Sequence, residues 1–386
     1  MIYLDNNATT MVAPEVKEAM LPYLSEDYGN PSTLYDFGKK IRRVIEEARA
    51  QVAELLGARS EREVVFTSGG TESNHTAIFS ALRALPARKR IVTTQVEHSS
   101  VLKCVERMSG AGYQLTQIGV SPSGAFLWDD FERALSDDVA VVSIMWANNE
   151  TGVLFPIERI ASAVKERGIL IHVDAVQAVG KFAIKLDRVP IDYLSCSAHK
   201  FHGPKGIGGL YVREGSPYFP LFVGGRQERD RRAGTENVPG IIGLACALKL
   251  AVETPASGEL RIQALRERLE QCLVSEIAES FVNGRDCPRI SNTANITIPK
   301  VDSEALLIRL GQAGIAASSG SACLTGALEA SHVLKAMGHS DELAMSSLRF
   351  SLSRYTMADE LESALRIIPE MVSEIRAFHR REELTR

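Results

Sequence analysis

A chain of 386 residues, with 45% hydrophobic and 24% charged residues, has the composition of an ordinary globular protein, and its length predicts two domains. The formal net charge of −4 gives no reason to expect nucleic acid as a partner, because the densest basic stretch, residues 226–232, is interrupted by acidic residues. No apolar run approaches the ~20 residues that span a bilayer, so we expect no membrane partner. Residues 1–5 lack the pattern of a signal peptide, and the six cysteines are scattered, which predicts a cytoplasmic protein with free thiols and no metal site.

Strand-like and helical patterns alternate from about residue 41 to residue 250. Apolar residues from Ile41 to Leu56 recur at helical spacing, and Gly57 can cap the end of that helix. Strand-like apolar runs follow at residues 63–67, 91–95, 139–145, 169–173 and 193–197, with 206–212 as one arm of a hairpin. This alternation predicts an α/β fold with a mixed, mostly parallel sheet covered by helices.

The composition changes at residues 254–258, which read as a domain boundary. Beyond it the patterns mix again, with strand-like runs at 295–298, 315–318 and 348–352 and a helical run at 303–310. We therefore predict a large domain over residues 14–255. Residues 1–13 and 256–386 form a smaller α/β domain in this interpretation.

Polar residues follow several of the predicted strands, at the ends where an open α/β sheet binds its ligands. After the strand at 63–67 the chain turns through glycines into a helix, whose first N–H groups, with Gly70 and the Thr71 hydroxyl, can cradle a phosphate. Ser197 and His199, at the end of another strand, can reach the same phosphate. The alternative for the first segment is an ordinary strand–turn–helix connection.

Three further side chains fit the other parts of one ligand. A buried Asp174 needs a cationic partner, such as a protonated pyridine nitrogen, although an aspartate there can also cap a helix. Lys200, close to other positive charge, can lose its proton and bond to a carbonyl group, unless it is a solvated loop lysine and Lys205 takes its place. Asn149 can bind a phenolic oxygen or a substrate carboxylate, or belong to a plain turn. Pyridoxal 5'-phosphate explains all these segments together.

A set of motifs extends this pattern along nearly the whole chain. They are Asp-Asn-Asn-Ala-Thr-Thr at 5–10, Ser-Gly-Gly-Thr-Glu-Ser at 68–73, Ser-Ala-His-Lys at 197–200, Arg-Ala-Gly-Thr-Glu-Asn at 232–237 and Ser-Ser-Gly-Ser-Ala-Cys at 318–323. With them the sequence resembles the cysteine desulfurases of the NifS/IscS type, and the NifS branch more closely. These belong to the aspartate-aminotransferase-like, fold type I pyridoxal phosphate enzymes.

The resemblance implies a role for each candidate residue. Lys200 would hold the cofactor covalently, His98 would stack on its ring and assist proton transfer, and Arg349 would bind the substrate carboxylate with Asn149. Asp174 would hold the ring nitrogen and Gln177 the phenolic oxygen. The implied phosphate ligands are Gly70, Thr71, Ser197, His199 and, from the second subunit of a homodimer, Thr235.

The resemblance also makes Cys323 the nucleophile that takes sulfur from L-cysteine as a persulfide and leaves L-alanine. An iron–sulfur scaffold protein of the NifU or IscU type would accept the sulfur. Two departures from the family pattern, Leu324 for a hydroxyl residue and Ala330 for proline, follow the cysteine. The alternative activities are those of a selenocysteine lyase or an aminotransferase, and transamination needs no thiol.

Overall fold

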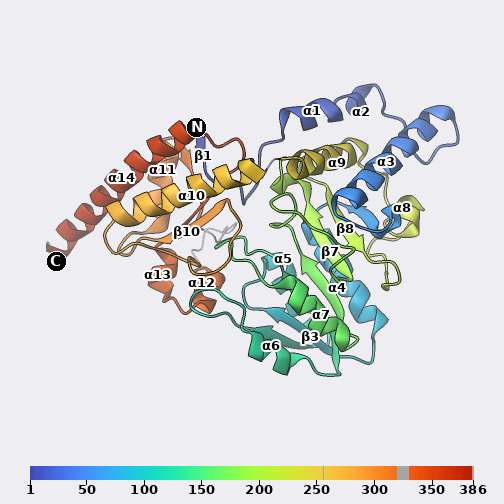
Figure 1. Ribbon diagram of the computed structural model, residues 1–386, viewed down its shortest axis with the longest axis horizontal. Coiled ribbons are helices and arrows are strands. Elements are labelled where there is room, and N and C mark those ends of the chain that lie inside the picture. Colours follow the sequence, from blue (N-terminus) through green and yellow to red (C-terminus); the bar gives the residue numbers. More distant parts are fainter. Residues whose placement is uncertain (255, 320–329, 385–386) are drawn as a thin grey trace.

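The computed structural model describes residues 1–254, 256–319 and 330–384. Within them the chain builds a seven-stranded sheet, a three-stranded sheet and a two-stranded sheet. Figure 1 shows the large sheet with its helices on one side of the molecule and the two small sheets with α10, α11 and α14 on the other.

The large sheet has the strand order β2-β8-β7-β6-β5-β3-β4. Its strands are β2 (Val64–Thr67), β3 (Arg90–Thr94), β4 (Gln114–Ile118), β5 (Val139–Met145), β6 (Leu170–Asp174), β7 (Tyr193–Ser197) and β8 (Gly208–Val212). The strands from β7 to β4 run parallel to their neighbours, whereas β8 is antiparallel to both β7 and β2. The predicted mostly parallel sheet is confirmed, and so is the hairpin arm, which pairs with β7.

Helices cover both faces of this sheet. They are α1 (Pro14–Met20), α2 (Pro22–Ser25), α3 (Asp36–Leu55), α4 (Gly70–Ala84), α5 (Ser99–Gly110), α6 (Trp128–Ala134), α7 (Ile157–Glu166), α8 (Gln227–Asp230) and α9 (Val238–Val252), with the 3₁₀ turns η1 (Glu61–Glu63) and η2 (Ala198–Lys200). The predicted first long helix begins five residues earlier than its apolar pattern, at Asp36 instead of Ile41, because Asp36, Lys39 and Lys40 in its first turns are exposed and polar. After its end, Gly57 adopts φ +65° and donates its N–H to the Glu54 carbonyl, which stops the helix.

A buried ion pair joins α3 to the segment that follows β8. Arg49 Nη1 lies 2.5 Å from Glu228 Oε2, and both side chains are only 3% exposed. The same carboxylate accepts the backbone N–H of Phe66 at 2.9 Å. The interrupted basic stretch at 226–232 thus contributes an acidic residue to the interior.

The other part of the chain returns to the N-terminus. The three-stranded sheet consists of β9 (Phe281–Val282), β10 (Thr293–Thr297) and β12 (Ser347–Ser351), which pair antiparallel. In the two-stranded sheet, β1 (Ile2–Tyr3) pairs parallel to β11 (Ile315–Ala316). The helices of this part of the chain are α10 (Ala256–Glu276), α11 (Ser303–Gln312), α12 (His332–Ala336), α13 (Asp341–Met345) and α14 (Ala358–Leu384). Leu4 packs in one apolar core with Ile296 and Phe350. The domain boundaries at residues 13/14 and 255/256 stay a prediction.

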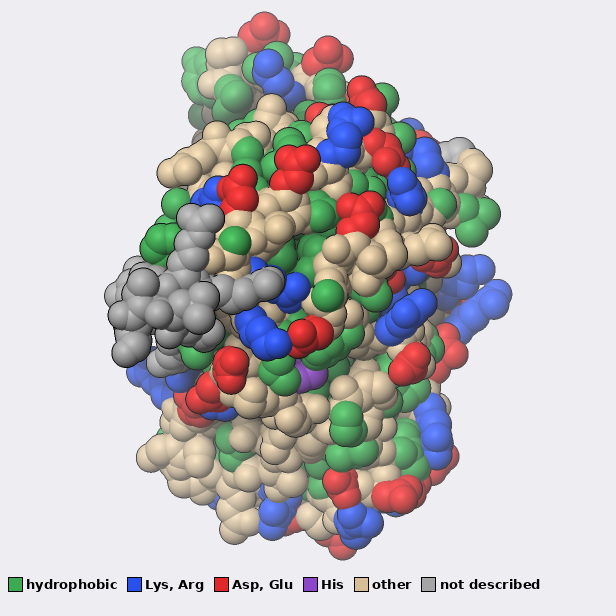
Figure 2. Space-filling model, turned by 90° about the vertical axis from the view of Figure 1, so that its left-hand side faces the viewer, with side chains coloured by type: hydrophobic (Ala, Val, Ile, Leu, Met, Phe, Trp, Pro, Cys, Tyr) green, Lys and Arg blue, Asp and Glu red, His purple; other side chains and the backbone are tan. Residues whose placement is uncertain are grey.

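No single helix in the described parts of the chain is long and apolar enough to cross a membrane. One pair of helices, Val238–Val252 with Ser257–Glu276, bent by 82°, meets that test together by length and composition only. On the face drawn in Figure 2, acidic and basic side chains are interspersed, and a histidine is visible between charged side chains in a hollow.

Candidate active site

Strands β2, β5, β6 and β7 end at the same edge of the large sheet, and a cavity of about 730 Å³ lies there. This volume suits a cofactor together with a small substrate. The predicted site residues that line it are Gly70, Thr71, His98, Asn149, Asp174, Gln177, Ser197, His199, Lys200 and Arg349. Residues separated by more than a hundred positions in the sequence therefore meet in one cavity.

One end of the cavity is the N-terminus of α4, where the N–H groups of the first helical turn favour an anion. A Cβ atom at Gly70 would lie 2.8 Å from Val176 Cγ2, so the turn has no room for a larger residue. Ser197 ends β7 beside it. His199 lies 3.1 Å from the Thr9 hydroxyl through Nδ1, and burial lowers the pKa of His199 to about 4. Hydroxyl, imidazole and backbone N–H groups are the donors that a phosphate needs.

Asp174 is the last residue of β6. Its Oδ1 accepts the backbone N–H of Val176 at 3.0 Å, and its Oδ2 accepts a hydrogen bond from Asn74 Nδ2 at 2.8 Å. A turn follows and not a helix, so the alternative that Asp174 caps a helix is wrong. The carboxylate is 5% exposed and lines the cavity, where a cationic ring nitrogen would match its charge.

Lys200 ends the 3₁₀ turn η2. Its Nζ donates to the backbone carbonyls of Asn7 at 2.6 Å and Ala8 at 2.9 Å. Burial, and then repulsion by Arg349, lower the pKa of Lys200 to about 8. Such a lysine is a better nucleophile near neutral pH than an ordinary one. Lys205, the alternative, is exposed and does not line the cavity.

His98 precedes the first residue of α5 and faces the cavity. Desolvation lowers the pKa of His98, while the nearby Asp174 carboxylate acts against that shift and Lys200 and His332 add to it. A neutral imidazole therefore lines the cavity at neutral pH.

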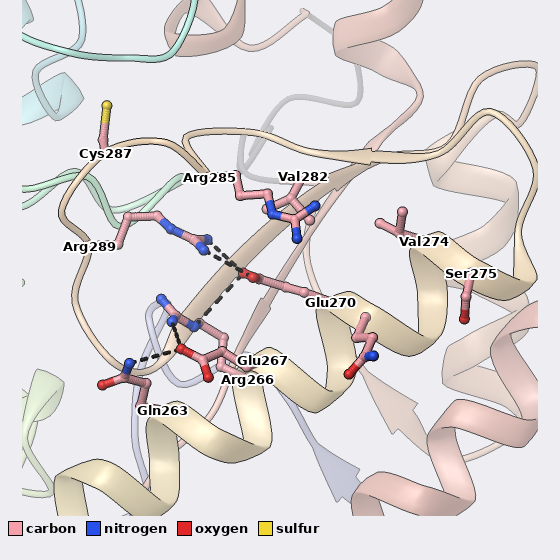
Figure 3. Close-up of a pocket in the computed structure, with 11 residues that line it drawn as sticks. Gln263, Arg266, Glu267, Glu270, Val274, Ser275, Val282, Arg285, Cys287 and Arg289 are labelled. Atoms are coloured by element: carbon pink, nitrogen blue, oxygen red, sulfur yellow. Dashed lines mark hydrogen bonds and ion pairs between the residues drawn. The ribbon is translucent and has the colours of Figure 1, made fainter.

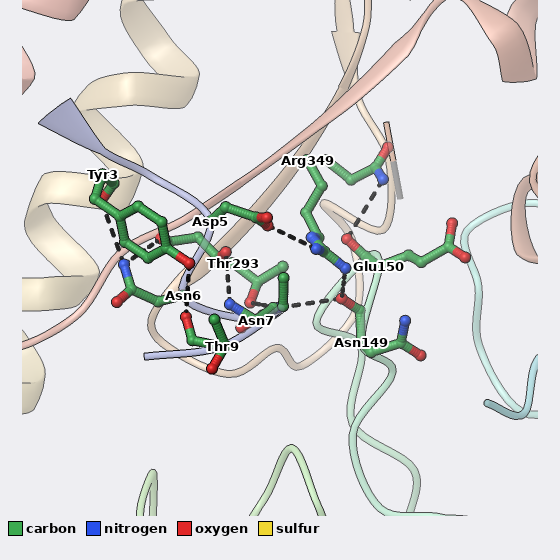
Figure 4. A network of polar contacts seen from close by, with 12 residues as sticks. Tyr3, Asp5, Asn6, Asn7, Thr9, Asn149, Glu150, Thr293 and Arg349 are labelled. Carbon is green, nitrogen blue, oxygen red and sulfur yellow. Dashed lines mark hydrogen bonds and ion pairs between the residues drawn. The ribbon is translucent and has the colours of Figure 1, made fainter. Parts of the chain in front are cut away.

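A polar network connects the opposite wall to the N-terminal segment, and Figure 4 shows Arg349 reaching between Asp5 and Asn149. Arg349 Nη2 lies 2.7 Å from Asp5 Oδ1, and Nη1 lies 3.1 Å from the Asn149 carbonyl. Its Nε is buried and has no partner among the described residues. Asn7 Nδ2 donates to the Asn149 carbonyl at 3.1 Å and to Thr293 Oγ1 at 2.8 Å. The guanidinium is thus fixed in position with donor capacity left over.

Gln177 Nε2 donates to the Asn7 carbonyl at 3.0 Å, and Gln177 Oε1 accepts from Lys181 Nζ at 2.5 Å. Burial holds the pKa of Lys181 well below its usual range. Sequence reasoning assigned no role to Asn7 or Lys181. The signal available for Asn7 was the motif at residues 5–10, which by itself shows neither the contact with Gln177 nor the one with Lys200.

One described residue of the predicted site, Thr235, does not line the cavity. It is exposed. Cys323, with Leu324, lies outside the described residues. Ser318 and Ala330, the described residues near the two ends of that gap, both line the cavity.

A second cavity, of about 710 Å³, lies along α10 and the segment after β9. Figure 3 shows Arg266, Glu270 and Arg289 joined by ion pairs in it. Arg289 Nη1 lies 2.6 Å from Glu270 Oε1, so these charges largely neutralise each other. None of the residues predicted for the site lines this cavity.

A mostly parallel sheet whose strand ends surround a half-buried lysine, a carboxylate and a helix N-terminus defines the fold type I class of pyridoxal phosphate enzymes. The aminotransferase class-V family model matches residues 2–363 of this chain. The chain belongs to that family, which depends on pyridoxal 5'-phosphate.

Named relatives are similar over almost the full length. Cysteine desulfurase 2 of Trichormus variabilis is 51% identical over 378 residues, which are 98% of this chain and 94% of the relative. Cysteine desulfurase NifS of Azotobacter vinelandii is 47% identical over 375 residues, 97% of this chain and 93% of the relative. Among solved structures, a NifS-like protein matches with a TM-score of 0.90 and 36% identity, over 96% of this chain and 99% of that one. SspA in complex with cysteine matches with a TM-score of 0.81 and 33% identity, over 92% and 100%.

Proposed function

We propose that this enzyme is a cysteine desulfurase that converts L-cysteine to L-alanine and carries the released sulfur as a persulfide on Cys323. The observation that supports it best is the meeting of Lys200, Asp174 and Arg349 around one cavity. They offer a covalent anchor, a partner for a cationic ring and a partner for a carboxylate. The relatives named above carry the name of this activity.

The residues divide between the parts of the cofactor. Gly70, Thr71, Ser197 and His199 hold its phosphate, Asp174 its ring nitrogen and Gln177 its phenolic oxygen. Lys200 would hold the cofactor covalently through its deprotonated amine, for which the depressed pKa of about 8 is suited. When bound, the cofactor withdraws electrons from the substrate and makes the α-proton acidic.

The substrate is held by its carboxylate. Arg349 has a buried Nε without a partner among the described residues, and the side-chain amide of Asn149 lines the same cavity. Ser318 and Ala330, the described residues near the two ends of the segment that carries Cys323, line the same cavity. The Cys323 thiolate attacks the substrate sulfur, an S–S bond forms as the C–S bond breaks, and alanine leaves after protonation.

The enzyme works as a homodimer in this proposal, with Thr235 of the second subunit adding a phosphate contact. The exposed position of Thr235 is compatible with a contact between subunits. The persulfide then passes to an iron–sulfur scaffold protein of the NifU or IscU type in the cytoplasm.

The deciding experiment is a mass spectrum of the Cys323 peptide after L-cysteine is added to the holoenzyme without reductant, with alanine assayed in parallel. We expect one extra sulfur on that peptide and an equal amount of alanine in the first turnover. Cys323→Ser abolishes both products and keeps the cofactor absorption, whereas Cys246→Ser, a half-buried thiol on α9, changes neither.

The other outcomes separate the alternatives. Alanine without added sulfur on Cys323 means a lyase route, as in a selenocysteine lyase. A keto acid in place of alanine means transamination. Either result refutes the desulfurase mechanism while leaving the cofactor site intact.

A further inference from the structure

A chain of hydrogen bonds runs from Asp174 to His98 through Asn74 and Ser100. The proposed function gives these two residues no role. Asn74 Nδ2 donates to Asp174 Oδ2 at 2.8 Å and to Ser100 Oγ at 2.9 Å. Ser100 Oγ lies 2.9 Å from His98 Nδ1. Asn74 is 1% and Ser100 9% exposed, and both line the cavity.

The donors in this chain fix where the proton of His98 lies. The backbone N–H of Ser100 points at His98 Nδ1 at 3.1 Å, and an N–H can only donate, so Nδ1 must be an acceptor. Ser100 Oγ accepts from Asn74, which leaves its own hydrogen to be donated to Nδ1. A neutral ring with an unprotonated Nδ1 carries its proton on Nε2, which has no hydrogen-bond partner among the described residues.

The direction of the amide of Asn74 is equally determined. Its Nδ2 faces a carboxylate oxygen, so a flipped amide would set oxygen against oxygen. Oδ1 of Asn74 is buried without a partner among the described residues. The orientation of the amide is therefore fixed by the two hydrogen bonds that Nδ2 donates, one to Asp174 and one to Ser100.

The charges around His98 add to this arrangement. His98 caps α5, a helix of 12 residues, and the positive end of a helix disfavours an imidazolium. Lys200 and His332 face the ring and also disfavour it, and Asp174 favours it. Further along α5, Lys103 and Glu106 pair with each other at 3.0 Å.

We propose that Ser100 and Asn74 are positioning residues that hold His98 as a neutral imidazole with its proton on Nε2, and tie the orientation of its ring to the carboxylate of Asp174. The inference deepens the proposed function and rests on it where His98 meets the substrate. His98 then meets the substrate as a hydrogen-bond donor through its Nε2–H.

The test is nitrogen NMR of the holoenzyme labelled in its histidines, with the His98 signals assigned by their loss in His98→Asn. The wild type is expected to show the Nε2–H tautomer. Ser100→Ala removes one of the two hydrogen bonds donated to Nδ1, and these bonds stabilise the neutral ring. Losing one of them should raise the proton affinity of the ring about two- to tenfold. Ser100→Thr, which keeps the hydroxyl, restores the wild-type titration. Ser109→Ala, an exposed serine at the other end of α5, leaves it unchanged.

In steady-state assays, Ser100→Ala lowers kcat and leaves KM for L-cysteine unchanged, because the substrate is bound elsewhere. An Nδ1–H tautomer in the wild type, or an identical His98 titration in wild type and Ser100→Ala, overturns the inference. The tautomer and the titration of His98 are both measured by NMR without turnover. An enzyme that shows the expected tautomer and makes no alanine would refute the proposed function alone.

Discussion

The substitution Arg349→Lys tests the carboxylate site most directly. It keeps the positive charge but replaces a planar group with several fixed N–H donors by a single ammonium. In the protein, Nη2 is already engaged by Asp5 at 2.7 Å and Nη1 by the Asn149 carbonyl at 3.1 Å, while Nε is buried and unpaired among the described residues. A lysine ammonium would have to be shared between Asp5, Asn149 and the substrate.

The size of the effect follows from the bonds lost. A carboxylate that binds arginine through two N–H groups keeps at most one such bond with lysine. A hydrogen bond to a charged group contributes roughly 1.5–3 kcal/mol. We therefore expect kcat/KM for L-cysteine to fall about 10- to 150-fold, mainly through a higher KM.

Initial rates of alanine release over a range of L-cysteine concentrations measure this, with cofactor content and absorption as the check on folding. Arg366→Lys, an exposed arginine on α14, is the matched control and should leave KM unchanged. If Arg349→Lys retains its cofactor and its KM stays within about twofold of the wild type, Arg349 does not bind the carboxylate.

Three further predictions concern the cofactor and the fold. The rate at which the apoenzyme captures pyridoxal phosphate, followed by absorption, should rise with pH and level off above about 8, because Lys200 must be neutral to react and its pKa is lowered to about 8; a rate still rising at the ordinary lysine pKa of about 10.4 would contradict the assignment. Gly70→Ala should weaken cofactor binding in equilibrium dialysis by about 1–3 kcal/mol, because its Cβ would lie 2.8 Å from a valine methyl, whereas Gly110→Ala, with nothing within 4 Å, should not. Glu228→Gln should lower the free energy of unfolding in urea by about 3–5 kcal/mol, because it removes the buried charge partner of Arg49, which keeps only its ion pair with the more exposed Glu46, and an equal loss in the exposed Glu47→Gln would show that burial is not the cause.

The sequence predicts those helices and strands whose apolar residues form a recognisable local pattern. The strand at 193–197 has the predicted bounds, because Tyr193 and Leu194 begin it and the polar Ser-Ala-His-Lys motif marks its end. Asp174 and Lys200 could be assigned to one site because parallel strands end at a common edge. β4, Gln114–Ile118, was missed, since its alternating polar residues belong to an edge strand that is only partly buried.

Ser100 shows a different limit. A serine near the start of a helix is common, and its usual interpretation is a residue that satisfies the helix end. Here the roles are exchanged: the imidazole of His98 accepts the backbone N–H, and the serine hydroxyl lies between that ring and Asn74. Only the positions of three side chains in space distinguish the two cases.

The N-terminal segment shows why the remaining contacts could not be derived from local patterns. The Asn7 carbonyl accepts from Lys200 Nζ and from Gln177 Nε2, and the Asn7 side chain bonds to the Asn149 carbonyl and to Thr293 on β10. One residue thus contacts the end of the large sheet and the three-stranded sheet together. No periodicity encodes such a residue, because it belongs to neither a helix nor a strand and these four partners are 142 to 286 positions away. The distance between Lys200 and Arg349 is therefore set in part by a short segment whose sequence, taken alone, reads as a turn.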